Sequence, residues 1–179
     1  MTPRRPARWP VAAGGWALLG AVLAGCATPP PPATIVSGRL SVSVAAQAGQ
    51  PARGMNASFD LRGDGEAGEL RLSTLLGPQI AAARWSPGRA SLVTADGEKL
   101  YPDLTSLAQD ALGEALPLQA LPDWLAGRPW AGAPSRRSAT GFEQLGWTLD
   151  LAAWAEGFVV ARRNDEPVVT LRVRLEPSS

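Results

Sequence analysis

The feature that most constrains the fold is a two-residue alternation of apolar and polar side chains, which returns in one short segment after another. Period 2 is typical of strands with one buried face, and turns rich in Gly, Pro and Asp separate the segments. Alternating strands joined by short turns predict an antiparallel sheet with one face in water. The predicted strands cover residues 38–44, 55–62, 68–73, 79–85, 90–94, 98–101, 147–151, 158–161 and 169–175.

The period changes in the middle of the chain, where apolar residues recur at the spacing of a helix face. Asp103 is suited to cap the start of a first helix, and Gly113 is suited to end it. A second short stripe ends at Gly127, and residues 128–140 are rich in Pro, Gly, Ser and Arg, which predicts a loop. Neither helix is long enough to be stable alone. Each is therefore expected to pack on the sheet through its stripe, which is Leu104, Leu107, Ala108, Ala111 and Leu112 in the first and Leu118, Leu121 and Leu125 in the second.

The order of many strands, two short helices and more strands limits the architecture. A single antiparallel sheet with this many strands is expected to curl. Helices placed in the middle of the chain would then lie against its concave apolar face. We therefore predict a mainly β domain with short helices, namely an incomplete antiparallel β-barrel whose helices plug an apolar cavity, and not a β-sandwich.

The first 26 residues have the order of a bacterial lipoprotein signal. Arg4, Arg5 and Arg8 precede an uncharged stretch that ends in Leu23-Ala24-Gly25-Cys26, and Cys26 is the one cysteine of the chain. A basic start, an apolar stretch of about 13 residues and small residues before the cut are typical of a secretory signal, and the stretch is too short to span a bilayer core of ~30 Å. We expect residues 1–25 to be cleaved and the thiol of Cys26 to carry a diacylglycerol; a lone buried thiol in a secreted protein is the alternative.

The residues after the cysteine are typical of a tether. Residues 26–34 contain four successive prolines, which favour an extended polyproline II conformation of ~3.1 Å per residue. Such a segment would hold a domain of residues 35–179 roughly 10 Å or more from the membrane. Ala27 follows the cysteine, whereas an aspartate there commonly retains a lipoprotein in the inner membrane of enteric bacteria. We therefore expect an outer-membrane location, with the domain facing the periplasm.

Charge and composition argue against several function classes. Without residues 1–25 the chain has 17 − 3 = 14 basic and 16 acidic residues, a net charge of −2, which argues against nucleic-acid binding. The chain has no histidine, and an acylated Cys26 leaves no thiol, so common catalytic bases and metal ligands are missing. The close acidic pairs lie at predicted turns. We expect a monomer without enzymatic activity, cofactor or metal; the acidic pairs are Asp64/Glu66, Asp96/Glu98 and Asp165/Glu166.

Two leucines sit where a polar turn is expected. Leu75 and Leu76 directly precede Gly77-Pro78, a pair that demands a turn. Turn tips are normally polar because they lie at the surface. Periodicity alone favours leucines that end the strand with one or both side chains in the core. The alternative is that one of them points into solvent to touch a membrane or an acyl chain.

Several short motifs together resemble the LolB family of outer-membrane lipoproteins, over nearly all of residues 35–176. The most specific block has the pattern Leu-Pro, Trp-Leu-x-Gly-x-Pro. It is formed by Leu116-Pro117-Leu118, Leu121, Trp124-Leu125 and Gly127-Arg128-Pro129. The other matching pieces are Gly38-Arg39-Leu40, Leu70-Arg71-Leu72 through Leu76-Gly77, Leu92-Val93, Asp96-Gly97, Gly146-Trp147 and Leu171-Arg172-Val173-Arg174-Leu175.

The resemblance implies a half-open antiparallel barrel whose helices close an apolar cavity. It also implies that the chain accepts lipoproteins from a LolA-like periplasmic carrier, binds their acyl chains and inserts them into the outer membrane. Family members carry an exposed leucine before a glycine in a hairpin loop, which matches Leu76, and Leu75 would share or take over its role. The candidate cavity residues, each of which taken singly is also typical of ordinary core, are Leu40, Val42, Phe59, Leu70, Leu72, Trp147 and Leu149. A passive lipid-binding or scaffold lipoprotein remains the alternative.

Overall fold

A computed structural model describes residues 35–47, 49–112 and 116–177. The signal segment 1–25, Cys26 with the tether 26–34, and Gly113 lie outside the described residues. Residues Pro31–Ser179 form one compact unit.

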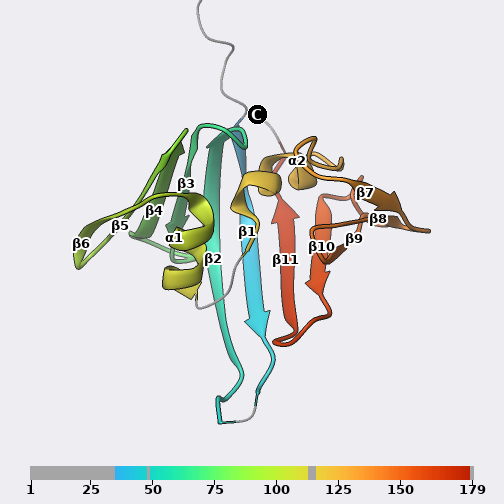
Figure 1. Ribbon diagram of the computed structural model, residues 1–179, viewed down its shortest axis with the longest axis horizontal. Coiled ribbons are helices and arrows are strands. Elements are labelled where there is room, and N and C mark those ends of the chain that lie inside the picture. The colour runs from blue at the N-terminus through green and yellow to red at the C-terminus, as the bar shows by residue number, and fades with distance from the viewer. Residues whose placement is uncertain (1–34, 48, 113–115, 178–179) are drawn as a thin grey trace, which may run out of the picture. The chain divides into compact units, whose positions relative to one another are not determined.

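Eleven antiparallel strands form one sheet, in the order β6-β5-β4-β3-β2-β1-β11-β10-β9-β8-β7 (Figure 1). The end strands β6 and β7 do not pair with each other, so the sheet is open, as predicted for an incomplete barrel. The strands are β1 Ile35–Val44, β2 Arg53–Gly63, β3 Gly68–Ser73, β4 Gln79–Ser86, β5 Arg89–Thr94, β6 Gly97–Tyr101, β7 Ser135–Arg137, β8 Gly141–Gln144, β9 Trp147–Asp150, β10 Phe158–Arg163 and β11 Val169–Leu175.

All nine predicted strands are confirmed, and two short strands were missed. The loop predicted for residues 128–140 is wrong over β7, where three exposed residues pair with β8 at the border of the sheet. Their pattern carries no alternation because neither face of β7 is buried. In β8 the alternation exists, but one of its two buried residues is Gln144, which is 3% exposed. Because glutamine is polar, the sequence shows no apolar residue at this buried position, and the alternation typical of a strand could not be recognised.

Both predicted helical stripes are helical and lie on the same face of the sheet (Figure 1). They form α1 Leu104–Leu112, the 3₁₀ turn η1 Leu118–Ala120 and α2 Leu121–Leu125. The carboxylate of Asp103 accepts a hydrogen bond of 2.7 Å from the backbone N–H of Ser106, which confirms it as the N-cap of α1. No helix in the described part of the chain has the length and apolar character needed to cross a membrane.

A polar link fastens α1 to the border strand β6. Asp110 accepts hydrogen bonds from the Lys99 ammonium at 2.8 Å and from the Tyr101 hydroxyl at 2.6 Å. These hydrogen bonds hold the pKa of the Asp110 carboxyl below its ordinary value. In the helix stripe, Leu104, Leu107 and Ala108 are buried, with Leu107 at 3% and Ala108 at 0% exposure, whereas Ala111 is exposed. Apolar packing and one ionic contact therefore together position α1 over β5 and β6.

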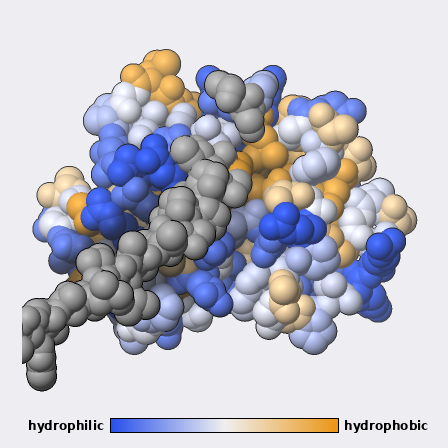
Figure 2. Space-filling view, turned by 90° about the horizontal axis from the view of Figure 1, so that it is seen from above, coloured by the Kyte–Doolittle hydropathy of each residue, from blue (hydrophilic) through white to orange (hydrophobic). Residues whose placement is uncertain are grey.

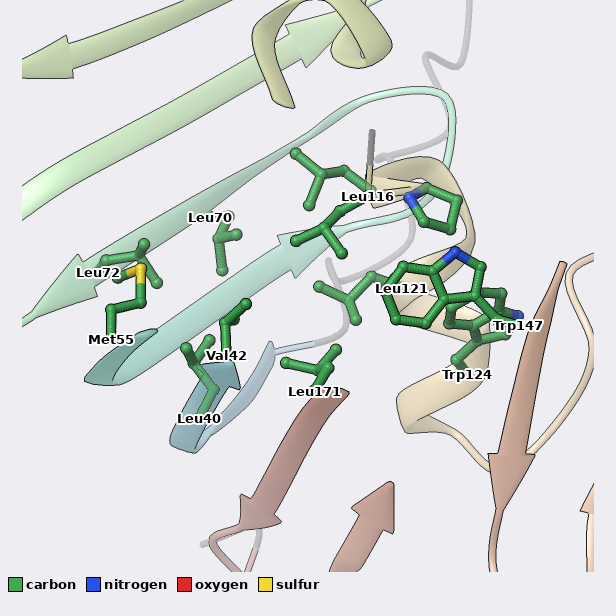
Figure 3. A pocket seen from close by; sticks show the side chains of 12 residues that line it. Leu40, Val42, Met55, Leu70, Leu72, Leu116, Leu121, Trp124, Trp147 and Leu171 are labelled. Atoms are coloured by element: carbon green, nitrogen blue, oxygen red, sulfur yellow. The ribbon is translucent and has the colours of Figure 1, made fainter. Parts of the chain in front are cut away.

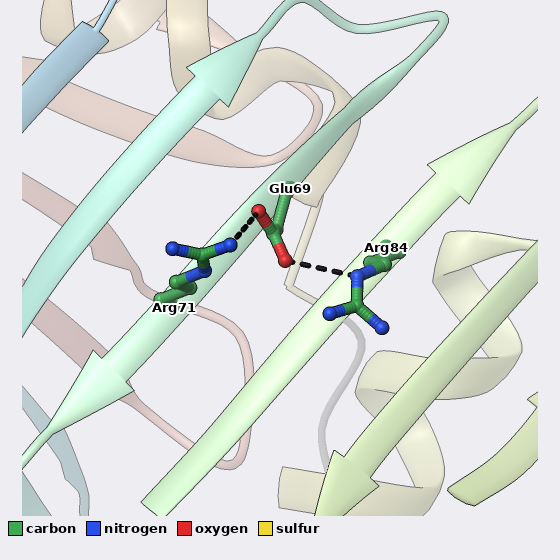
Figure 4. A network of polar contacts seen from close by, with 3 residues as sticks. All are labelled: Glu69, Arg71 and Arg84. Atoms are coloured by element: carbon green, nitrogen blue, oxygen red, sulfur yellow. Dashed lines mark hydrogen bonds and ion pairs between the residues drawn. The ribbon is translucent and has the colours of Figure 1, made fainter. Parts of the chain in front are cut away.

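The opposite face of the sheet is polar and carries an ionic network. Glu69 of β3 accepts hydrogen bonds from Arg71 at 2.8 Å and from Arg84 of β4 at 2.9 Å (Figure 4). Burial would raise the pKa of the Glu69 carboxyl, but the two guanidinium groups hold it below its ordinary value. The sheet thus has one apolar face under the helices and one wet face, as its alternation predicts.

Candidate functional site

An apolar hollow, termed here the central cavity, lies between the sheet and the helical segment. Its volume is ≈ 60 Å³. Figure 3 shows its lining side chains, which come from the strands on one side and from the segment of η1 and α2 on the other. Every lining residue is apolar, so the cavity offers no directional hydrogen-bonding group of a side chain except the indoles. The lining residues are Leu40, Val42, Met55, Leu70, Leu72, Leu116, Pro117, Leu118, Leu121, Trp124, Trp147 and Leu171.

A larger hollow, termed the α1 cavity, lies beside it under α1. Its volume is ≈ 370 Å³, and it shares four lining residues with the central cavity. The lining residues are Met55, Leu70, Leu72, Ile80, Ala81, Ala83, Leu92, Thr94, Leu107, Ala108, Ala111 and Leu118. A third hollow of ≈ 170 Å³ shares Val42, Met55 and Leu116 with the central cavity and Ala111 with the α1 cavity. The three hollows therefore adjoin along the apolar face of the sheet.

The buried side chain of Gln144 fixes the position of α2. Its amide oxygen accepts hydrogen bonds from the Trp124 indole at 2.8 Å and from the Trp130 backbone N–H at 2.9 Å. Its amide nitrogen donates to the carbonyls of Trp130 and Ala133, both at 2.7 Å. All hydrogen-bonding positions of a buried amide are thus matched. The Trp124 ring, held in this way, packs at 6.1 Å between centroids from that of Trp147, and both rings line the central cavity.

The end of α2 requires a glycine. Gly127 has a φ of +74°, and a Cβ atom there would lie 2.8 Å from the ring of Trp154. The Trp154 indole in turn donates a hydrogen bond of 3.1 Å to the Leu125 carbonyl at the end of the helix. The Trp-Leu-x-Gly-x-Pro block therefore has a structural account: its tryptophan meets Gln144 and its glycine makes room for Trp154.

The hairpin between β3 and β4 presents its leucines to solvent. Leu76 is 101% exposed and Leu75 is 49% exposed. The turn is closed by the Thr74 N–H, which donates to the Pro78 carbonyl at 3.2 Å. The interpretation from periodicity, which tucked one or both leucines into the core, is wrong because the turn begins directly after Ser73 and carries both side chains away from the sheet. Ile80, just after the turn, lines the α1 cavity and is 39% exposed.

Figure 2 shows apolar residues gathered to the right of the centre, with hydrophilic residues beside them, and a separate apolar group at the upper left edge. The hairpin tip and the start of β1 lie at opposite ends of the sheet. β1 runs antiparallel to β2, β2 to β3 and β3 to β4, so the β3–β4 turn shares its end of the sheet with Val44 and not with Ile35. The exposed leucines are therefore separated from Ile35, the first residue of β1, along the direction of the strands.

Comparison with known proteins adds the family to this geometry. The family model described as Outer membrane lipoprotein LolB matches residues 35–176. The chain belongs to the LolB family. It is 36% identical over 192 residues to the outer-membrane lipoprotein LolB of Bordetella parapertussis, with 97% of this chain and 94% of the relative covered. The LolB of Bordetella pertussis gives the same identity and coverage. The LolB of Cupriavidus metallidurans is 32% identical over 130 residues, 69% of this chain and 62% of the relative.

The resemblance to the LolB family is thus confirmed, and the structure shows where each candidate site residue lies. Leu40, Val42, Leu70, Leu72 and Trp147 line the central cavity. Phe59 and Leu149, at 3% and 0% exposure, line none of the three hollows, because they are packed on all sides within the core. The cavity lining also includes Met55, Leu116 and Leu118, which the sequence did not predict as cavity residues. Leu116 and Leu118 belong to the motif block that carried the resemblance.

Among the acidic pairs, the structure assigns a turn contact to Asp64. Asp64 accepts hydrogen bonds from the N–H groups of Glu66 at 2.8 Å and Ala67 at 2.9 Å, which close the β2–β3 turn and hold the pKa of its carboxyl below the ordinary value. Among the described residues, no group of three or more Cys, Asp or Glu side chains is placed to hold a metal ion. Asp64 is thereby accounted for as a turn residue.

Proposed function

We propose that the chain accepts lipoproteins from a periplasmic carrier by binding their acyl chains in the three adjoining hollows, and that it inserts these lipoproteins into the outer membrane. As a LolB-family member it is an outer-membrane lipoprotein, and Cys26 is the proposed site of its own lipid. The observation that carries the proposal is the largely apolar lining of three adjoining hollows between the open sheet and the helices, in which Arg53 and Thr94 are the polar side chains. The relatives bear the name outer-membrane lipoprotein LolB, and their name supports the same role here.

The energetic problem is the transfer of hydrocarbon through water. Each methylene removed from an apolar phase costs ~0.8 kcal/mol, so a lipoprotein with two or three acyl chains faces tens of kcal/mol. Leucine, methionine and tryptophan surfaces offset this cost without directional contacts, since apolar attraction depends on area. A non-directional site binds chains of any register along the hollows. It also releases them to a bilayer, which provides still more apolar contact.

The exposed Leu76 supplies an apolar contact with the membrane during release. Burial of one leucine side chain contributes about 1.5–3 kcal/mol. That contribution orients the hairpin toward the bilayer but is too small to anchor the protein, and the lipid on Cys26 is the proposed anchor. Ile80 continues the apolar surface from the hairpin to the rim of the α1 cavity. Acyl chains that leave the α1 cavity beside Ile80 would emerge near the hairpin that carries Leu76.

The test is a transfer assay with the lipidated chain in vesicles and an acylated cargo delivered by its carrier. Leu76→Glu should bind cargo normally but transfer it to the bilayer about 10- to 100-fold more slowly, since about 1.4 kcal/mol corresponds to tenfold. The matched control is Leu100→Glu, which changes another exposed leucine, 68% exposed on β6, and should transfer as wild type does. Equal transfer by Leu76→Glu and wild type contradicts the role of the hairpin.

A second variant tests the cavity itself. Ala81→Phe places an aromatic ring in the lining of the α1 cavity and should weaken the binding of a fluorescent fatty-acyl probe. Ala152→Phe, at an exposed turn, is the control and should leave probe binding unchanged. If Ala81→Phe folds and binds the probe as wild type does, acyl chains occupy another place. Binding that depends on Ala81 together with transfer that ignores Leu76 would instead support passive lipid binding.

A further inference from the structure

The wet face of the sheet carries a group of arginines on three neighbouring strands. Arg39 of β1 lies directly opposite Arg174 of β11, and Arg172 lies two residues away opposite Ser41. Arg162 of β10 lies opposite Thr170 of β11. All four arginine side chains are exposed, and they are termed here the arginine patch. They alternate with Leu40, Val42 and Leu171, which face the central cavity, so the patch lies on the opposite side of the sheet.

The arginine patch has no ion-pair partner among the described residues. Arg71 and Arg84 on the same face share Glu69 (Figure 4), whereas none of the four patch arginines is paired in this way. Acidic residues lie at the border of the patch. Asp60 lies opposite Ser37, Asp150 lies opposite Val160, and the backbone N–H of Glu176 donates to the Ser37 carbonyl. Like charges directly opposite each other destabilise a sheet. Arg39 and Arg174 therefore add positive charge to this face without stabilising the fold through a pair.

The surroundings of the patch suit phosphate groups in a membrane surface. Arginine binds phosphate through two parallel hydrogen bonds, and two hydroxyl residues lie directly across from patch arginines, Ser41 opposite Arg172 and Thr170 opposite Arg162. The Phe158 ring is 43% exposed, and the Arg174 guanidinium lies 5.5 Å from its centroid. Exposed aromatic rings beside cationic side chains are typical of proteins that lie on a membrane interface. A soluble anion would make no use of the ring.

The chain also keeps this face close to the bilayer. Arg39 lies four residues after Ile35, the first residue of β1. If Cys26 is anchored, as the proposed function requires, the nine residues 26–34 reach at most ~30 Å. A surface tethered at this length meets lipid headgroups at a high effective concentration, so weak contacts suffice.

We propose that the arginine patch binds the phosphate groups of anionic phospholipids in the membrane that anchors the chain. The domain then rests on the bilayer by the wet face of its sheet, with the cavities turned toward the periplasm, the posture suited to receiving cargo. Release would require a tilt onto the end of the sheet that carries Leu76. The proposal rests on the proposed lipid anchor and not on acyl-chain binding.

The test uses the lipidated full chain in vesicles without cargo. Because Cys26 is the one cysteine and its thiol is consumed by the lipid, Asn56→Cys, beside the patch opposite Ser41, introduces a single site for a fluorophore. Thr105→Cys on α1, on the other side of the sheet, is the control site. The readout is quenching by lipids with a spin-labelled headgroup. In vesicles that contain phosphatidylglycerol we expect quenching at the Asn56 site to exceed that at the Thr105 site. This excess should disappear when the salt concentration is raised from about 0.01 M to about 1 M, because the charges are then screened.

Charge variants identify the residues. One arginine near an anionic surface contributes about fivefold to binding. The triple variant Arg39→Gln/Arg172→Gln/Arg174→Gln should therefore lower about 100-fold, at low salt, the ratio of anchored domains whose patch lies on the membrane to those whose patch does not. Arg89→Gln/Arg136→Gln/Arg137→Gln removes three exposed arginines elsewhere and should change nothing. Equal quenching in phosphatidylcholine vesicles, or unchanged quenching in the patch variant, overturns the proposal. The proposal is also overturned if the patch variant keeps its quenching but no longer binds the carrier, because the patch would then be a binding site for that protein. Chains washed from the vesicles by alkali would show instead that the lipid anchor is absent.

Discussion

The buried amide of Gln144 should be the most sensitive polar group of the domain. Gln144→Leu keeps the volume of the side chain but removes all four hydrogen bonds that join β8 to α2 and to the segment after it. The Trp124 indole is 2% exposed and Gln144 is 3% exposed, so water cannot replace the lost partner of the indole N–H. The Trp130 and Ala133 backbone groups lie in half-buried residues and regain partial hydration.

The magnitude follows from these exposures. An unsatisfied buried donor costs about 1–3 kcal/mol, and each hydrogen bond whose groups are rehydrated costs about 0.5–1.5 kcal/mol net. One unsatisfied indole and three rehydrated backbone groups give a loss of about 3–5 kcal/mol in the free energy of unfolding. For a domain of this size 1 kcal/mol corresponds to roughly 3 °C in Tm, so the midpoint should fall by about 10 °C or more.

The assay is urea unfolding of the chain in detergent, followed by tryptophan fluorescence. The control is Gln79→Leu, since Gln79 is exposed on β4, and it should unfold within about 0.5 kcal/mol of wild type. A double-mutant cycle with Trp124→Phe isolates the indole contact and should give a coupling of about 1 kcal/mol or more. If Gln144→Leu costs no more than Gln79→Leu, the hydrogen bonds of Gln144 do not hold α2 on the sheet.

Two further predictions follow from local geometry. Gly127→Ala should lower the free energy of unfolding by more than about 1 kcal/mol, measured by the same urea titration. It should cost more than Gly88→Ala, which has a φ of +72° but nothing within 4 Å of the added atom, and equal losses would exclude a clash with Trp154. Because the hydrogen bonds from Lys99 and Tyr101 hold the folded pKa of Asp110 below its ordinary value, its contacts to β6 stabilise the fold above that ordinary value and are lost as the pH falls through the folded pKa. The protection factors of the α1 amides, which correct the exchange rates for the intrinsic effect of pH, should therefore fall in acid in the wild type. Asp110→Asn should show low protection factors already at neutral pH, without this acid step.

The fold could be predicted wherever a segment buries one complete face with apolar residues. β2 illustrates this, because Ala57, Phe59 and Leu61 are all buried and their neighbours are not. β8 could not be predicted, because one of its buried positions is Gln144, whose partners come from a segment 11 to 20 residues away in the chain. Local patterns carry no information about such distant partners.

The candidate site could be predicted only in part, because an alternating strand shows which face is apolar but not whether another side chain covers it. Leu72 and Phe59 are direct cross-strand neighbours on the same face, yet Leu72 borders two hollows and Phe59 borders none of the three. The difference lies in the tertiary packing around the two side chains, which the alternation along a strand does not show. The exposure of Leu76 was likewise not given by periodicity, and only the resemblance of the hairpin suggested it.

The unpaired borders of the sheet have a consequence for capacity. A closed barrel has a fixed circumference, whereas a sheet that ends at β6 and β7 can flatten or tighten while every ladder hydrogen bond stays intact. Charged residues and short strands at the two edges disfavour pairing with other sheets. The edge strand β6 carries Glu98 and Lys99, and β7 consists of Ser135, Arg136 and Arg137. For the proposed function, a sheet of adjustable curvature would let one protein accommodate lipoproteins with either two or three acyl chains.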